Sequence, residues 1–409
     1  MRRLHLLLIF IFSVFLASGQ NNTNSPYSVF GIGELENSEG GRNMGMGGSG
    51  IALRSDLFLN LTNPASLTSI PLQSLATDAG INFRFSNLKN QYKSVNVLNG
   101  NISWAAIAFP INHTFGASFC LNPKSSVGYT IYSTKSLEGT AFSYPVTYKG
   151  EGGLSEFSAA LGALVAKNLS LGLKGSLLWG NVVKTTEDTP PLGSAITRVD
   201  NTNYVGMLFK PGFQYQTKLS KNTVFTLGGT AEISSYLNGS STITITSGST
   251  TVLSTIEEGS QIKLPSRMGL GMALGYKSKY LLTFDFNRSD WRGAELELDS
   301  KRLSVNNSFH LGMEFAPGYD PQRRWQTKKY RVGALYQTGY LNIYGTQISN
   351  YAATCGVSFP WKKDRNSFNL SLEAGKQGTL NNQLILESYV KLNCSFNLWE
   401  HWFIPRKYD

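Results

Sequence analysis

The side chains best suited to bind a metal or to attack a substrate are four histidines and three cysteines. They are His5, His113, His310, His401, Cys120, Cys355 and Cys394. No pair of them has the spacing of a zinc site or a redox motif, and the sequence contains neither a Gly-x-Ser-x-Gly elbow nor a phosphate-binding loop. His310 could be combined with serines at polar strand positions into a hydrolase triad, but so many serines occupy such positions that the match carries no weight. We therefore expect no metal, no cofactor and no enzymatic activity.

A second set of reactive groups consists of charged side chains that fall at the polar positions of alternating segments. They are Arg84, Lys174, Lys210, Glu232, Arg267, Asp285, Glu314, Glu373, Glu387 and Lys391. If these positions face one interior, the charges can pair with one another. Alternatively, a lysine or arginine can hold the acidic headgroup of a ligand. Mutual pairing is the simpler interpretation, and the sequence leaves both open.

The first nineteen residues have the features of a secretory signal. Arg2 and Arg3 form a basic start, Leu6 to Leu16 an apolar stretch, and Ala17-Ser18-Gly19 supplies small residues before a cleavage site at Gln20. We therefore expect residues 1–19 to be removed from an exported protein.

The elements that position the charges are alternating strands. Along Leu169 to Trp179, leucines and the tryptophan occupy one face, whereas Ser170, Gly172, Lys174 and Ser176 occupy the other. Long two-faced strands in an exported chain are typical of a transmembrane β-barrel with lipid outside and small polar residues inside. A soluble secreted β-protein is the alternative, but the strands are longer than the usual 5–6 residues. The fold class expected is all-β: a transmembrane antiparallel barrel of about 14 strands.

The expected strands and connections follow the rhythm of an outer-membrane barrel. The strands are predicted at 75–89, 94–109, 114–132, 153–166, 169–184, 201–217, 222–236, 262–276, 279–290, 303–316, 327–338, 347–359, 366–377 and 382–397. Short connections alternate with long ones, which places the long ones outside the cell. The Ser/Thr-rich stretch from Gly239 to Thr255 is read as an external hairpin. Residues 74–397 are therefore assigned to the barrel and 398–409 to an aromatic, basic periplasmic tail.

Aromatic and basic residues indicate contact with a membrane and not with nucleic acid. Trp104, Trp179, Tyr276, Tyr280 and Trp361 lie near strand ends, where amphipathic rings favour the headgroup level. The formal charge of +11 is concentrated in predicted turns such as Lys362-Lys363. Anionic lipid headgroups, or plain solvation, account for such a pattern.

Residues 20–73 do not read as strands. The segment is rich in glycine around Gly45-x-Gly47-Gly48-x-Gly50 and contains Asn63-Pro64-Ala65. The glycine pattern loosely resembles a dinucleotide-binding loop, but no strand of a βαβ unit precedes it. Glycine permits compact backbone, and a compact non-helical segment is tolerated inside a barrel. We expect a lumen hatch here, with a loose periplasmic leader as the alternative.

The third predicted strand contains a proline. Asn122-Pro123 interrupts Phe115–Lys124, and proline removes a ladder donor. In a closed barrel, either the strand kinks inward there or it ends at Leu121.

Together, these features resemble the FadL-type family of outer-membrane transport proteins for hydrophobic compounds. The resemblance rests on Gly47-Gly48-Ser49-Gly50-Ile51-Ala52, on Asn63-Pro64-Ala65, and on about fourteen strands with a disrupted third one. It implies that Gly47, Gly48, Gly50, Ala52, Asn63, Pro64 and Ala65 belong to a hatch, and that Asn122-Pro123 marks a lateral gate. The opening Ser25–Gly33 resembles FadL-like barrels of Bacteroidetes-type bacteria. The long tail and the polar strand faces depart from the family.

Two functions follow as hypotheses. The first is passive uptake of a hydrophobic, fatty-acid-like molecule through a plugged lumen with a lateral exit at the third strand. The second is a non-transporting accessory barrel within a larger outer-membrane secretion or barrel-assembly complex, with other outer-membrane or periplasmic proteins as partners. A continuous apolar pocket beside Pro123 would favour uptake, whereas a filled lumen would favour the accessory role.

Overall fold

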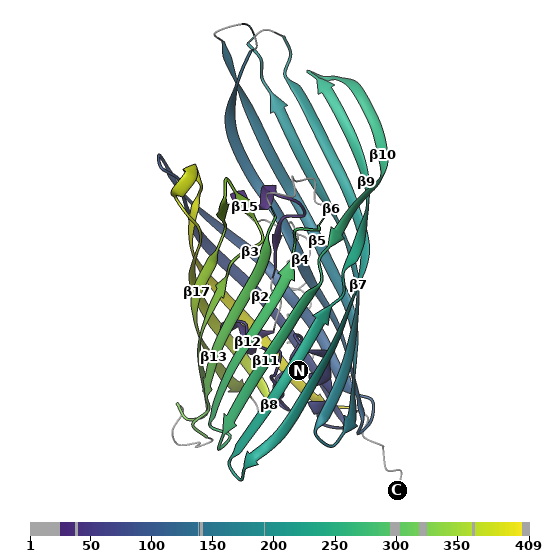
Figure 1. Cartoon of the computed structure of the whole chain (residues 1–409), viewed down its shortest axis with the longest axis vertical. Coiled ribbons are helices and arrows are strands. Elements are labelled where there is room, and N and C mark those ends of the chain that lie inside the picture. The colour runs from purple at the N-terminus through teal and green to yellow at the C-terminus, as the bar shows by residue number, and fades with distance from the viewer. Residues whose placement is uncertain are drawn as a thin grey trace, which may run out of the picture.

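The computed structural model describes residues 25–36, 40–137, 139, 142–191, 193–294, 303–318, 325–361 and 365–402. Within them, 14 antiparallel strands form a closed barrel (Figure 1). They are β2 (Ser74–Lys89), β3 (Ser94–Pro110), β4 (Phe115–Ser136), β5 (Ser143–Ala166), β6 (Leu169–Asp188), β7 (Ile196–Ser220), β8 (Thr223–Glu232), β11 (Arg267–Tyr276), β12 (Tyr280–Asp290), β13 (Val305–Phe315), β14 (Lys329–Gln337), β17 (Asn350–Trp361), β18 (Asn366–Gly378) and β19 (Leu386–His401). The ring closes where β19 pairs with β2. The predicted fold class is thus confirmed. The predicted signal, Lys362-Lys363 and residues 403–409 lie outside the described residues.

The alternation of β6 matches the prediction. Leu171, Leu173 and Leu177 are 43%, 52% and 40% exposed, whereas Ser170 and Ser176 are 0% and 6% exposed. Leucines therefore face lipid and serines face the interior. The aromatic prediction was wrong at Trp104, which is fully buried and donates its indole N–H to Asp78 at 2.5 Å. Alternation assigns a face correctly only if the register is unbroken, and a bulge between Gly80 and Ile81 shifts the register opposite Trp104.

The lipid-facing assignment predicts the effect of a buried charge. Leu173→Arg is expected to lower the free energy of unfolding by about 2–4 kcal/mol, because a guanidinium near the bilayer midplane loses its hydration. Tyr132→Arg is the control, since Tyr132 is 79% exposed near the outer end of β4, and it is expected to change stability by less than about 0.5 kcal/mol. Urea unfolding in liposomes measures both. Equal effects would contradict the assignment.

One side of the barrel rises well above the other (Figure 1). Strands β5, β6 and β7 have 24, 20 and 25 residues, longer than their predicted spans. The hairpin β9 (Ser235–Ser247) and β10 (Thr250–Leu264) continues this side, because the outer half of β7 pairs with β9. The predicted external hairpin is confirmed, and it takes residues at both ends that were assigned to the neighbouring barrel strands. We call the outer halves of β4–β7 together with β9 and β10 the raised sheet.

The boundary of the tail was placed too early. Residues Leu398 to His401 belong to β19, because the register with β2 continues from Leu398 opposite Thr77 to His401 opposite Ser74. Trp399 is anchored further, since its indole N–H donates to the carbonyl of Leu57 at 2.8 Å.

The N-terminal segment, residues 25–36 and 40–73, contains η1 (Pro26–Val29), β1 (Glu34–Leu35), α2 (Gly41–Met44) and η2 (Pro64–Ser69). The η2 turn contacts β3–β7, and α2 contacts β2 and β17–β19, on other parts of the ring. A segment that touches the inward faces of strands so far apart lies inside the barrel. Among the described residues, no helix is long and apolar enough to cross a membrane. Three short elements, β15 (Asn342–Ile343), β16 (Thr346–Gln347) and η4 (Asn381–Gln383), lie in external connections.

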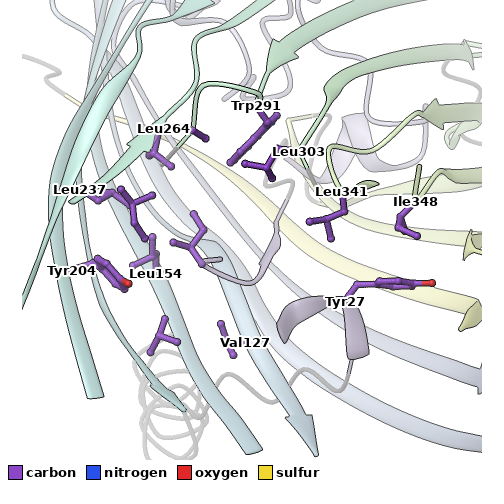
Figure 2. Packing of buried hydrophobic residues seen from close by; sticks show 14 of the residues in the cluster. Tyr27, Val127, Leu154, Tyr204, Leu237, Leu264, Trp291, Leu303, Leu341 and Ile348 are labelled. Carbon is purple, nitrogen blue, oxygen red and sulfur yellow. The ribbon is translucent and has the colours of Figure 1, made fainter. Parts of the chain in front are cut away.

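An apolar cluster lies toward the outer mouth of the lumen. It includes Tyr27 and the residues labelled around it in Figure 2, from β4, β5, β7, β9, β10 and the external connections. The N-terminal segment therefore meets apolar packing near the mouth. Deeper in the barrel the segment packs a second apolar cluster, in which Met44, Leu59 and Leu67 meet Trp104 of β3 and Trp399 of β19, beside polar groups of the wall.

Candidate functional site

The predicted hatch residues form one hydrogen-bonded unit. Asn63 precedes the first turn of η2, with Pro64 at its first position, and its side-chain oxygen accepts the N–H of Ala65 at 3.1 Å. Its amide nitrogen donates to the carbonyls of Ile51 at 2.8 Å and of Phe213 on β7 at 3.0 Å. The Asn-Pro-Ala motif thus joins the glycine-rich loop to the barrel wall.

The glycine-rich loop is held by side chains of the opposite wall. Asp285 on β12 accepts the backbone N–H groups of Gly50 at 2.6 Å and Ile51 at 2.9 Å. Thr354 accepts the N–H of Gly47 at 2.9 Å. Gly48 donates its N–H to the carbonyl of Asn43 within the loop, and Ala52 is buried. Asp285, predicted as a possible lumen charge, is therefore a structural acceptor that binds the glycine-rich loop.

The barrel wall makes room for this segment with glycines that sequence reasoning did not identify. A Cβ added to any of nine inward-facing glycines of the described strands β4–β14 would lie within 2.7 Å of an atom of the N-terminal segment. They are Gly116, Gly162, Gly172, Gly212, Gly228, Gly269, Gly271, Gly312 and Gly333. Glycine inside a strand weakens it and often marks close approach of another backbone. That signal was available in the sequence at the polar strand positions.

This close fit predicts the effect of one added side chain on β6. In Gly172→Val, the Cβ would lie 2.4 Å from the backbone nitrogen of Ala65, so we expect η2 to be displaced at a cost of about 1–3 kcal/mol. In the control Gly175→Val, on the lipid face of the same strand, the nearest atom is 3.6 Å away. Protease cleavage within residues 40–73 of the folded protein is the readout. Equal cleavage of both variants would refute the fit.

One predicted lumen charge, Glu314, forms a buried ion-pair group. Its carboxylate accepts from Arg42 of α2 at 2.7 and 2.9 Å and from Arg331 of β14 at 2.7 Å. The Phe58 ring lies 5.2 Å from the guanidinium carbon of Arg42 and 4.9 Å from that of Arg331. The group ties the N-terminal segment to β13 and β14.

A second group surrounds Asn122. Glu156 on β5 accepts from Lys174 at 2.7 Å, from Ser176 at 2.6 Å and from Asn122 at 3.4 Å. Lys124 pairs with Glu232 at 3.3 Å. Apart from Ser176, these residues line a cavity of about 80 Å³ together with Lys210 and Arg267. Within the described part of the chain, the Lys210 and Arg267 side chains have no ion pair within 4 Å. The lumen beside the predicted gate is therefore charged.

A third group holds β1. Arg84 on β2 pairs with Glu34 at 3.1 Å and with Glu387 at 2.9 Å, and Lys391 lies 3.9 Å from Glu36. Glu373 accepts the Tyr389 hydroxyl at 2.9 Å. Apart from Glu387, these residues line an outer cavity of about 200 Å³ that reaches Tyr27, Leu35, Trp291 and Tyr340. Burial raises the pKa of Tyr27 to about 12, so its hydroxyl stays protonated and donates to the carbonyl of Ile385.

The pairing of β4 is interrupted on one side only. The ladder with β5 includes Asn122 and Pro123, with a register shift before Ser125. The ladder with β3 ends where Ala105 faces Leu121. Beyond that point β1 takes the place of β3, since Leu35 pairs with Ser125 and Glu34 with Ser126. We call this unpaired stretch between β3 and β4 the seam. Pro123, eight positions after Phe115, lies at its lower end.

His310 is bonded as a structural residue. Its Nδ1 lies 2.6 Å from the carbonyl oxygen of Gly47, and its Nε2 lies 3.2 Å from the Ser308 hydroxyl. A hydrolase triad needs an acid on the nitrogen that here faces a carbonyl. The neighbouring acid, Asp285, is bonded to the glycine-rich loop. Among the described residues, no three His, Cys, Asp or Glu side chains group as metal ligands.

Solved structures of outer-membrane transporters share the fold. The Pseudomonas putida toluene transporter TodX is 14% identical, with 90% of this chain and 100% of that chain covered at a TM-score of 0.60. A Pseudomonas aeruginosa FadL homologue is 10% identical, with 91% and 100% covered at 0.60. The Ralstonia pickettii toluene transporter TbuX is 13% identical, with 88% and 98% covered at 0.58. At these identities the likeness is one of fold.

Comparison with sequences gives a more specific result. A search among curated proteins gives no match. The model of the family described as BamG matches residues 1–409, the whole chain. The chain therefore belongs to the BamG family, and its fold is that of a FadL-type outer-membrane barrel.

Proposed function

We propose that the chain is a non-transporting accessory barrel in the outer membrane of a Gram-negative bacterium, where it acts as a scaffold subunit of a barrel-assembly complex. The observation that carries the proposal is the filled lumen. Asp285, Thr354 and Glu314 bind the N-terminal segment from one part of the wall, and wall glycines on β4–β8 admit its backbone from another. Such a segment adds rigidity to a platform and opposes passage.

The chemistry of the remaining space also opposes passage of an apolar molecule. The cavity beside Asn122 is lined by Lys124, Glu156, Lys174 and Glu232, and an apolar ligand there would leave charged groups without water. The outer cavity and the cavity beside Asn122, about 200 and 80 Å³, are both below the roughly 300–1,000 Å³ of typical ligand pockets. We propose that the lumen carries out no catalysis and binds no cofactor.

The family name supports the context of barrel assembly. The test is purification of the tagged full chain from its native membrane in mild detergent, with quantitative identification of what remains bound. We expect the central outer-membrane barrel-assembly protein in stoichiometric amount. A second tagged outer-membrane barrel of similar abundance is the control. Recovery of the chain alone, or equal recovery of partners with the control, would overturn the proposal.

A second candidate is passive uptake of a small apolar molecule, and the seam favours it. On the side that faces β4, β3 has no strand partner beyond Ala105 among the described residues, although β2 pairs with its other side. Unpaired backbone at membrane depth is costly unless other groups satisfy it. The outer cavity reaches Leu35, which lies on β1 at the seam. The solved neighbours TodX and TbuX are described as toluene transporters. Movement of β1 would open a lateral exit for such a ligand.

A disulfide tests the second candidate directly. Leu35 and Ser125 are directly opposite in the β1–β4 pairing, so Leu35→Cys with Ser125→Cys can lock β1 over the seam. If the seam is an exit, uptake of radiolabelled toluene into cells is lost on oxidation and returns on reduction. Each single cysteine variant is the control. Uptake equal to that of cells lacking the protein, in every redox state, would exclude this candidate.

A further inference from the structure

The raised sheet ends in a strand edge outside the membrane. β10 is in register with β9 from Thr250 opposite Ser247 to Leu264 opposite Ser235. The next barrel strand, β11, pairs instead with β8. Among the described residues, no strand is in register with the other side of β10. Figure 1 shows this hairpin at the edge of the tall side of the barrel.

The regular part of this edge is six residues long. Register shifts lie between Thr251 and Leu253 and between Glu258 and Ser260, so Leu253 to Glu258 form the uninterrupted run. The run contains no proline, and Leu253 and Ile256 are 46% and 68% exposed. Natural edges are usually blunted by proline, lysine or bulges. Here bulges bound the run at both ends without blocking it.

Two carboxylates at the membrane-proximal end of the run determine which kind of strand can pair with this edge. Glu257 and Glu258 are exposed and have no ion pair among the described residues. A second copy of the chain in the same membrane would present its own β10 in the same direction, bringing like carboxylates together, which is unfavourable. A segment with a lysine or arginine opposite Glu257 or Glu258 would instead gain a cross-strand pair.

We propose that Leu253–Glu258 of β10 takes up an extended segment of an external partner protein as an added antiparallel strand, with a basic residue of that segment opposite the two glutamates. Backbone hydrogen bonds supply the affinity in this mode of recognition, and side chains supply the specificity. The inference concerns a surface remote from the lumen and does not rest on the accessory function.

The test uses the purified full chain in lipid nanodiscs and a synthetic peptide. Residues Ser240 to Ile245 of β9 already pair with Glu258 to Leu253, so the probe is the sequence of residues 239–246 with Ser240→Lys and Ser241→Lys. The control peptide has glutamate at both positions. We expect the lysine peptide to bind at least about tenfold more tightly by fluorescence anisotropy. In the variant Glu257→Lys with Glu258→Lys, the preference should reverse.

Backbone pairing needs its own control, because charge alone can attract a peptide. N-methylation of alternate residues removes the donors on one edge of the lysine peptide, and methylation of the intervening residues removes those on the other. We expect both methylated peptides to remain soluble. Only the peptide methylated on the edge that faces β10 should lose binding. The docking edge is refuted if both methylated peptides bind as well as the parent peptide. It is also refuted if the lysine and glutamate peptides bind with equal affinity. Both outcomes are independent of the test of the accessory function, which measures the partners recovered from native membranes.

Discussion

Replacing Glu314 with glutamine is expected to lower the free energy of unfolding by about 3–5 kcal/mol, because two buried guanidinium groups lose their common counter-charge. The side chains of Arg42, Glu314 and Arg331 are only 8%, 7% and 1% exposed. Water therefore cannot replace the carboxylate. The amide has nearly the shape of the carboxylate, so packing is preserved and the measured loss reports the charge. Urea unfolding in liposomes is the measurement.

The matched control is Glu187→Gln in the raised sheet. Glu187 lies 3.7 Å from Lys149, and their side chains are 42% and 53% exposed, so the same substitution should cost no more than about 1 kcal/mol. The readout specific to the site is protease cleavage within residues 40–73, since Arg42 belongs to α2. We expect release of the N-terminal segment in the Glu314 variant. Wild-type stability of that variant would mean that the segment is held without this group.

The strands could be predicted because their signal is local. Apolar and polar residues alternate with period 2 along each strand, so the lipid face of Leu169–Trp179 can be assigned without knowledge of any neighbouring strand. The hairpin around Gly239–Thr255 was recognised from composition for the same reason. The ends of β5, β7 and β19 were less predictable. Where a strand stops is decided by whether its neighbour continues, as β2 does for Leu398–His401.

The site could be predicted only as a list of residues. Asp285, Glu314 and Arg84 were identified as lumen charges from their strand positions, but each also binds a residue of the N-terminal segment that lies at least 50 positions away along the chain. Such pairs depend on barrel register, which one sequence does not determine. Pro123 shows the same limit. The proline was identified, but the loss of pairing lies on the β3 side, where β1 intervenes.

The filled lumen favours the accessory role, whereas the seam favours uptake. The two features are held by different residues. The bonds of Asp285, Asn63 and Glu314 hold the middle of the N-terminal segment, whereas β1 at the seam is held by Arg84 and Lys391. A gate that moves β1 alone therefore need not disturb the glycine-rich loop. This separation makes the loop and the seam independently testable.

Deleting residues 40–70 is expected to convert a closed barrel into an ion-conducting pore. The deletion removes the groups bonded to Asp285, Thr354 and Glu314 and empties the space beside Gly172, Gly212, Gly228 and Gly333. A wall of this many strands with glycine and serine inside leaves an aqueous channel. Single-channel recording in planar bilayers should show stable openings that the full chain lacks. Heat-dependent migration in SDS gels checks that the barrel has folded.

A folded deletion variant with unchanged conductance would show that the N-terminal segment does not close the lumen, and the accessory proposal would lose its main support. If the deletion fails to fold, Gly172→Val supplies the same test with the barrel intact, because displaced η2 should give brief openings that Gly175→Val does not. The channel so formed would be lined by Lys174, Lys210, Arg267 and Glu232. Among the described residues, Lys210 has no ion pair within 4 Å, so Lys210→Gln should shift ion selectivity toward cations. An unchanged reversal potential in this variant would contradict the lumen position of the side chain.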